Sequence, residues 1–321
     1  MRSSLRRTEV TSVDMVLIVA TVTLSMMSCG AARERLMNFR KLEYLAVAAP
    51  MMTPQTLSIT ADGRAQYVSH TNRDGLDRPE MGLFETNLPA DQVESLRAAL
   101  AKPPFRDWAD HDGRVNAGDA WRRVQVTEAS DVIMKQVGTF EPVPPPLDAF
   151  LDRMTQIVRR LAEHPVRVLR LNLQRARIQT KDELEVTFSL ENAGTQPFFC
   201  RTPRDLVGAA AGKLLVELSP DKPNSELKAE DLFSVELTQV ERVPPTEGVR
   251  SEGNWLELPP GGTAKFVARG RAKARGAGVY LAEMKYFSPL ETSSDGKPLL
   301  YGDLLSLTKK VEEAAPASTI R

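Results

Sequence analysis

The feature that most constrains the fold of this chain is a change of pattern at His164–Pro165. Beyond it, apolar residues recur at every second position, most cleanly at Leu184, Val186, Phe188 and Leu190. Alternation of this kind places the apolar side chains on one face of a strand. Several short strands separated by turn residues are typical of a β-sandwich.

The strands expected after this point are short and numerous. Besides 184–190, we predict strands over 213–218, 232–238, 255–258, 264–269, 278–286 and 303–309. The segment 184–197 is expected to end in an asparagine-glycine turn, and 256–266 to form a strand, a tight turn and its return partner. Together these segments resemble the immunoglobulin-like domains of bacterial envelope proteins, including those of proteinase-inhibitor modules. The resemblance covers about 165–310 and implies a sandwich fold without implying an activity.

Before the change of pattern, strands and helices alternate. Asp62–Gly63 indicates a hairpin, and Pro89 with Asp91 indicates the start of a helix that ends before Pro103. Two more strands are predicted at 121–127 and 131–137, followed by a strongly amphipathic helix over 147–161. We therefore predict a small α+β domain over 51–162. Its order of elements resembles small uncharacterised domains of bacterial exported proteins.

The stretch Met15–Cys29 contains no charged residue. Arg2, Arg6 and Arg7 precede it, and small residues follow it. A basic start, a short apolar segment and a small-residue exit are the parts of a secretory signal. The run is shorter than the roughly 20 apolar residues that a membrane-spanning helix requires.

The residues Met26-Met27-Ser28-Cys29 are similar to the lipobox of bacterial lipoproteins, although Met26 stands where that family usually has Leu, Val or Ile. The resemblance implies cleavage before Cys29 and a lipid on its thiol. We therefore expect a signal peptide at 1–28, a tether at 29–50 and a membrane-anchored lipoprotein of the bacterial cell envelope. Plain secretion and an uncleaved anchor are the alternatives. The tail 311–321 is expected to be disordered.

Composition excludes several functions. Lys plus Arg equal Asp plus Glu at 42 each, so no global field attracts nucleic acid. With three histidines, at 70, 111 and 164, a histidine-rich metal site is excluded. The second cysteine, Cys200, follows two phenylalanines, which favours a buried thiol over a reactive one. No nucleotide-binding or nucleophile motif occurs, so we expect no cofactor.

One loop shares positions with a calcium site. Asp110, Asp112 and Asp119 surround Gly113 at the spacing of a calcium-binding loop, which needs six to eight oxygen ligands. However, Trp108 occupies the first ligand position and supplies no oxygen. The closing Asp119 is also shorter than the usual glutamate. We predict a polar connection between strands and no metal site.

The functional hypothesis is a non-catalytic envelope protein, attached to the membrane by its lipid, whose sandwich binds an envelope protein or acts as a spacer. Aromatic and arginine side chains are the usual anchors of protein interfaces. The candidates are Phe198 and Arg201 in one long connection and Phe287 and Tyr301 in another. An alternative is that these aromatics cover the ends of the core. Two other functions stay open, an inhibitor or chaperone-like module and a hydrolase with a dispersed site.

Overall fold

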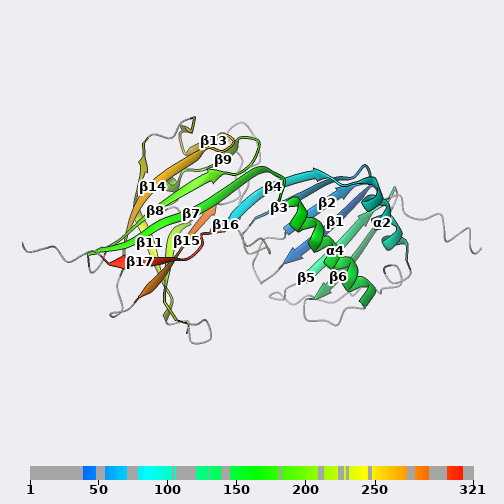
Figure 1. Cartoon of the computed structure of the whole chain (residues 1–321), viewed down its shortest axis with the longest axis horizontal. Helices are drawn as coiled ribbons and strands as arrows, with labels where there is room; N and C mark the ends of the chain where they lie inside the picture. Colours follow the sequence, from blue (N-terminus) through cyan, green and yellow to red (C-terminus); the bar gives the residue numbers. More distant parts are fainter. Residues whose placement is uncertain are drawn as a thin grey trace, which may run out of the picture.

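The computed structural model describes residues 39–47, 55–70, 79–102, 105, 121–129, 131–138, 145–180, 183–208, 213–222, 228, 231–244, 248–272, 279–288 and 302–313. Within these ranges the chain is mostly β and contains two α-helices, α2 (Ala90–Ala101) and α4 (Pro145–Leu161). Both helices lie over one part of the β-structure, and the rest consists of strands and short connections (Figure 1). Among these described residues, no helix combines the length and the apolar character needed to cross a bilayer.

The part that carries the helices is an antiparallel sheet with the strand order β4–β3–β2–β1–β5–β6. We refer to it as the helix-covered sheet. Its strands are β1 (Lys41–Val47), β2 (Gln55–Thr60), β3 (Arg64–Ser69), β4 (Glu80–Asn87), β5 (Trp121–Thr127) and β6 (Val132–Gly138). Gly63 adopts φ +92° between β2 and β3, and its N–H donates to the Thr60 carbonyl at 2.9 Å. The predicted hairpin is therefore confirmed.

The helices form where the pattern predicted them. On α2, Val93, Leu96 and Leu100 are buried, and the apolar stripe of α4 is buried along its whole length. The two stripes share one core with the alternate residues of the strands, including Leu42, Tyr44, Leu57, Ile59, Tyr67, Phe84, Val124 and Val126. Each fully buried large apolar side chain contributes about 1.5–3 kcal/mol, so these stripes hold both helices on the sheet.

The second part is a closed barrel. Its strands are β7 (Pro165–Thr180), β8 (Glu183–Asn192), β10 (Lys213–Pro220), β11 (Phe233–Val243), β14 (Thr263–Arg271), β15 (Tyr280–Ser288) and β17 (Lys309–Glu313). They follow the order β7–β8–β14–β11–β10–β15–β17. The last strand closes the ring, because β17 pairs antiparallel with β15 and parallel with β7. The result is a closed barrel of seven strands.

The predicted fold class, an α+β domain followed by an immunoglobulin-like sandwich, is wrong. A single continuous sheet runs through both parts, because β4 of the helix-covered sheet pairs with β7 of the barrel. Met81 on β4 packs in the barrel core, while Val168 on β7 packs in the helix-covered core. The expected boundary at His164–Pro165 lies where α4 gives way to β7. The chain is a mostly β protein in which the sheet crosses that point.

Gly82 shows how closely the two parts approach. A Cβ atom added to Gly82 would lie 2.1 Å from the Arg167 carbonyl oxygen, and the residue has φ +150°. A side chain at this position would therefore push β4 away from β7. On the same strand, the Glu85 N–H donates to the His164 carbonyl at 3.1 Å.

Three segment predictions also need correction. The expected tether over 29–50 contains strand β1, which pairs with β2 and β5. Leu42 and Tyr44 of this strand are buried in the core. The disordered tail over 311–321 begins inside β17. The strand expected over 303–309 is two strands, β16 (Gly302–Leu305) and β17.

The segment 256–266 does not form the predicted hairpin. Its first strand, β13 (Trp255–Leu258), leaves the barrel and joins a small sheet with β12 (Arg250–Glu252) and β9 (Phe198–Arg201). Its second strand, β14, pairs with β8 and β11 instead. The buried Asn192 holds this arrangement together, since its Nδ2 donates to the Gln196 and Leu258 carbonyls. The small sheet lies over one end of the barrel (Figure 1).

Candidate functional site

A cleft of about 1080 Å³ lies at that end of the barrel. Three structures surround it: the 3-10 helix η1 (Pro203–Leu206), the second half of β11, and the β12–β13 hairpin. The residues that line it are Thr202, Arg204, Asp205, Val207, Thr238, Gln239, Val240, Glu241, Arg242, Ser251, Gly253, Leu256 and Phe266.

The accessible lining of the cleft is mainly polar, and two of its apolar residues are buried. Leu256 and Phe266 are almost fully buried, and Val240 packs against the same core. Arg204 and Glu241 are exposed above them.

Local structure fixes the two walls. Thr202 precedes η1, and its hydroxyl donates to the Asp205 carboxylate, which holds the first turn of η1 in place. The opposite wall is a tight hairpin in which Glu252 pairs with Trp255. Gly253 adopts φ +55° in this two-residue turn, a conformation in which glycine is unstrained.

Arg201 lies beside the cleft. Its guanidinium carbon is 5.1 Å from the centroid of the Trp255 ring, and the two residues pair across β9 and β13. Stacking of this kind holds an arginine in one orientation. Phe199 on the same strand is 37% exposed.

The other predicted binding residues are distributed differently. Phe198 is 1% exposed and packs in the barrel core, so it covers the core end and presents no surface. Phe287 is 36% exposed and pairs with Lys213 at the start of β10. Because η1 contacts β10, β11 and β15, Phe287 lies at the same end of the barrel as the cleft. Tyr301, the lipidation candidate Cys29 and the calcium-like loop over 110–119 lie outside the described residues.

Cys200 is buried, as the sequence predicted. It is 1% exposed, and burial raises the pKa of its thiol to about 12, although a hydrogen bond with Tyr286 opposes this rise. A thiol in this environment is not a nucleophile at neutral pH.

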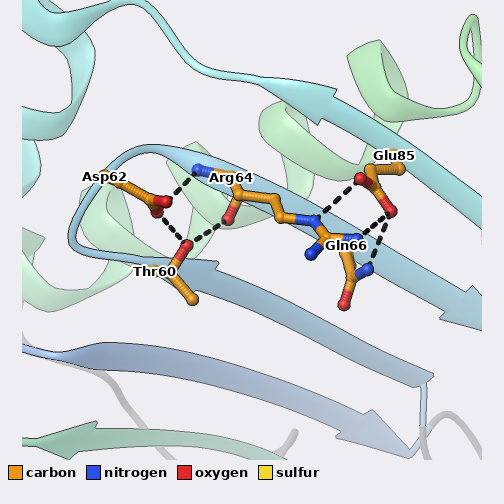
Figure 2. A network of polar contacts seen from close by, with 5 residues as sticks. All are labelled: Thr60, Asp62, Arg64, Gln66 and Glu85. Carbon is orange, nitrogen blue, oxygen red and sulfur yellow. Dashed lines mark hydrogen bonds and ion pairs between the residues drawn. The ribbon is translucent and has the colours of Figure 1, made fainter.

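A polar network on the β2–β3 hairpin is a second cluster of charged residues (Figure 2). The Arg64 Nε donates to Glu85 at 2.8 Å, and the Gln66 amide donates to the same carboxylate at 2.8 Å. These bonds lower the pKa of Glu85, and a hydrogen bond from Thr60 lowers the pKa of Asp62. The hydrogen bonds of this network all join residues of β2, β3, β4 and the turn between β2 and β3, so we assign it to stabilising the hairpin.

No group of three or more His, Cys, Asp or Glu side chains within the described ranges is arranged to hold a metal ion. The cleft was not predicted from the sequence. Its residues come from three separate segments, 202–207, 238–242 and 251–256, and pairing between β9 and β13 brings two of them together. Of the interface anchors predicted from the sequence, Arg201 lies beside the cleft and Phe287 lies at the same end of the barrel.

Comparisons with known proteins do not place the chain in a family. No protein family and no curated protein matches it. Among solved structures, a PapD-like domain of human CEP192 is 14% identical, with 46% of this chain and 86% of that chain covered and a TM-score of 0.20. The archaellum stator protein FlaG from Sulfolobus acidocaldarius is 14% identical, with 43% and 98% covered and a TM-score of 0.18.

A glycoside hydrolase of Vibrio harveyi, an exo β-N-acetylglucosaminidase, is 9% identical with a TM-score of 0.17. The match covers 47% of this chain and 19% of that enzyme. TM-scores as low as these three carry no argument about fold or function.

Proposed function

We propose that this chain is a non-catalytic binding protein of the bacterial cell envelope, anchored to the membrane by a lipid on Cys29. The cleft at the end of the barrel contacts a partner protein. The observation that carries the proposal is the cleft itself, whose lining includes the exposed Arg204 and Glu241, together with the exposed Phe199 and Phe287 at the same end of the barrel.

The surroundings of the cleft support the same function. Arginine and aromatic side chains contribute most of the binding energy in protein interfaces. Arg201 with Trp255, the exposed Phe199 and the exposed Phe287 all lie at this end of the barrel. The surface around the cleft therefore carries several such anchors.

A module that inhibits or protects an envelope enzyme would use the same surface. Identifying the bound partner distinguishes such a module from a protein that only links other envelope proteins. No observation on the described residues favours the hydrolase alternative.

Photo-crosslinking in cells tests the proposal. We would place p-benzoylphenylalanine at Gln239 or Ser251, which line the cleft, and at Ala98 on the exposed face of α2 as the control. We expect one discrete protein adduct from both cleft positions and none from Ala98. Identical adducts from all three positions, or none from the cleft, would contradict the proposal.

A further inference from the structure

Strand β11 has two different halves. Residues Phe233 to Glu236 pair with β10, and from Leu237 onward β11 pairs with β14. Among the described residues, no strand pairs with the other edge of β11 from Thr238 to Val243. We call this segment the open edge of β11. It lies along the cleft, because Thr238 to Arg242 all line it.

An edge of this kind presents backbone groups to any extended chain that approaches it. In a strand, alternate N–H and C=O groups point to opposite edges, and only one set bonds to β14. The other set points away from β14. An incoming extended segment satisfies such groups by adding as a further strand.

A β-bulge determines which side chains along the open edge of β11 face the barrel interior. Leu237 pairs with Gly270 and Gln239 with Arg269, so Thr238 is an extra residue. A bulge turns the residues that follow it to the opposite face.

After the bulge, Val240 pairs with Ala268 and Arg242 with Phe266, both of which face the barrel interior. Val240 and Arg242 therefore face inward and are half-buried, while Gln239 and Glu241 are exposed. Arg242 donates from Nη2 to the Val249 carbonyl at 3.3 Å. This bond holds the guanidinium at the mouth of the barrel, and an arginine has further donors that suit a carboxylate.

We infer that an extended segment of the partner protein adds as a strand to the open edge of β11. Its inward side chains are an apolar residue opposite Val240 and an acidic residue opposite Arg242, and its outward side chains include a basic residue opposite Glu241. Opposite charges on directly facing residues stabilise a strand pair, whereas like charges destabilise it. The inference rests on the proposed function and specifies how the partner is recognised.

Synthetic peptides test this mode of binding. The probe is a capped peptide containing Thr-Asp-Lys-Val-Thr, which in antiparallel pairing sets Val opposite Val240, Lys opposite Glu241 and Asp opposite Arg242. Its control, Thr-Asp-Val-Lys-Thr, has the same composition with Asp and Lys on one face. With the full-length protein, fluorescence anisotropy should give a dissociation constant of about 10–100 μM for the probe and at least tenfold weaker binding for the control. Equal affinities, or no binding of the probe at about 1 mM, would overturn the inference.

Backbone methylation separates strand addition from simple charge attraction. N-methylation at alternate peptide residues removes the donors that face one edge. One of the two alternate sets should weaken binding at least tenfold, and the other should leave it within about twofold. Equal weakening by both sets would show that the peptide does not bind as a strand.

Charge reversal identifies the facing residues. Arg242→Glu should weaken the probe at least tenfold, and a peptide with Lys in place of Asp should restore the affinity. Arg271→Glu, an exposed change at the other end of β14, is the matched control and should change neither. Both variants must keep the wild-type melting temperature, and a second variant, Arg242→Gln, replaces Arg242→Glu if that chain does not fold.

The crosslinking experiment distinguishes failure of the proposed binding function from failure of the proposed strand addition. If the cleft positions crosslink to a partner while the peptides fail, strand addition is wrong and the binding function stands. If neither experiment succeeds, both are wrong.

Discussion

The side chain of Arg170 on β7 reaches across to Glu80 on β4, with Nε 2.7 Å from the Glu80 carboxylate. Arg170 also contacts Glu191 of β8, with Nη1 3.2 Å from its Oε1. The Glu80 side chain is 3% exposed and that of Arg170 is 33% exposed. This ion pair joins the helix-covered sheet to the barrel at the point where β4 pairs with β7.

Arg170→Ala should lower the free energy of unfolding by about 3 kcal/mol, because it leaves the Glu80 carboxylate buried without its cation. Urea unfolding followed by circular dichroism measures this change. Arg175→Ala on the same strand is the matched control. Arg175 pairs with Glu312, and both side chains are about half exposed at 49% and 53%, so its loss should cost less than about 1 kcal/mol. Similar costs for the two variants would contradict the role assigned to Arg170.

Glu85 on β4 should make stability depend on acidity. Its pKa is lowered in the folded chain by hydrogen bonds from Arg64 and Gln66. A lowered pKa contributes stability that is present above the unfolded pKa of about 4.3 and is lost as the pH falls through the folded pKa.

We therefore expect Glu85→Gln to reduce the urea midpoint at pH 7 and to have a much smaller effect near pH 3. Glu94→Gln on α2, whose side chain is 72% exposed, should change little at either pH. An effect of Glu85→Gln that is equal at both pH values would contradict this prediction.

Cys200 should resist modification in the folded chain. Burial raises the pKa of its thiol to about 12, so almost no thiolate forms at pH 8. In a Cys29→Ser background, where Cys200 is the remaining cysteine, a thiol-specific disulfide reagent should react at a rate limited by unfolding. A Phe199→Cys, Cys200→Ser variant places the thiol at the neighbouring exposed position. Its thiol should react with the reagent without waiting for unfolding. Equal rates for the two thiols would be inconsistent with a buried Cys200.

Cys29 should determine membrane attachment. Two or three acyl chains anchor a protein firmly, whereas one chain holds it weakly. We expect the wild type in the membrane fraction, and Cys29→Ala released from it or retained as an uncleaved precursor of higher mass. Cys200→Ala is the control and should fractionate like the wild type. Identical fractionation and identical mass for wild type and Cys29→Ala would rule out the lipid anchor.

The sequence by itself determined most of the local structure. The Asp62–Gly63 turn, the stripe on α4 and the strand over 278–286 were all predicted from residues close together in the chain. Each is confirmed, because burial of one face depends on a period that is visible locally. Strand β1 carried the same alternation at Leu42 and Tyr44, but its charged surroundings favoured the wrong interpretation.

Tertiary structure alone decided which strands pair. The closure of the barrel depends on β17 lying parallel to β7, a contact between residues that are more than one hundred positions apart, such as Val311 and Ala176. The cleft depends on β13 leaving the barrel and on a one-residue bulge at Thr238 that turns Arg242 inward. Alternation along a strand fixes which face is buried, but it does not specify the neighbouring strand or the register, because those follow from packing between distant segments.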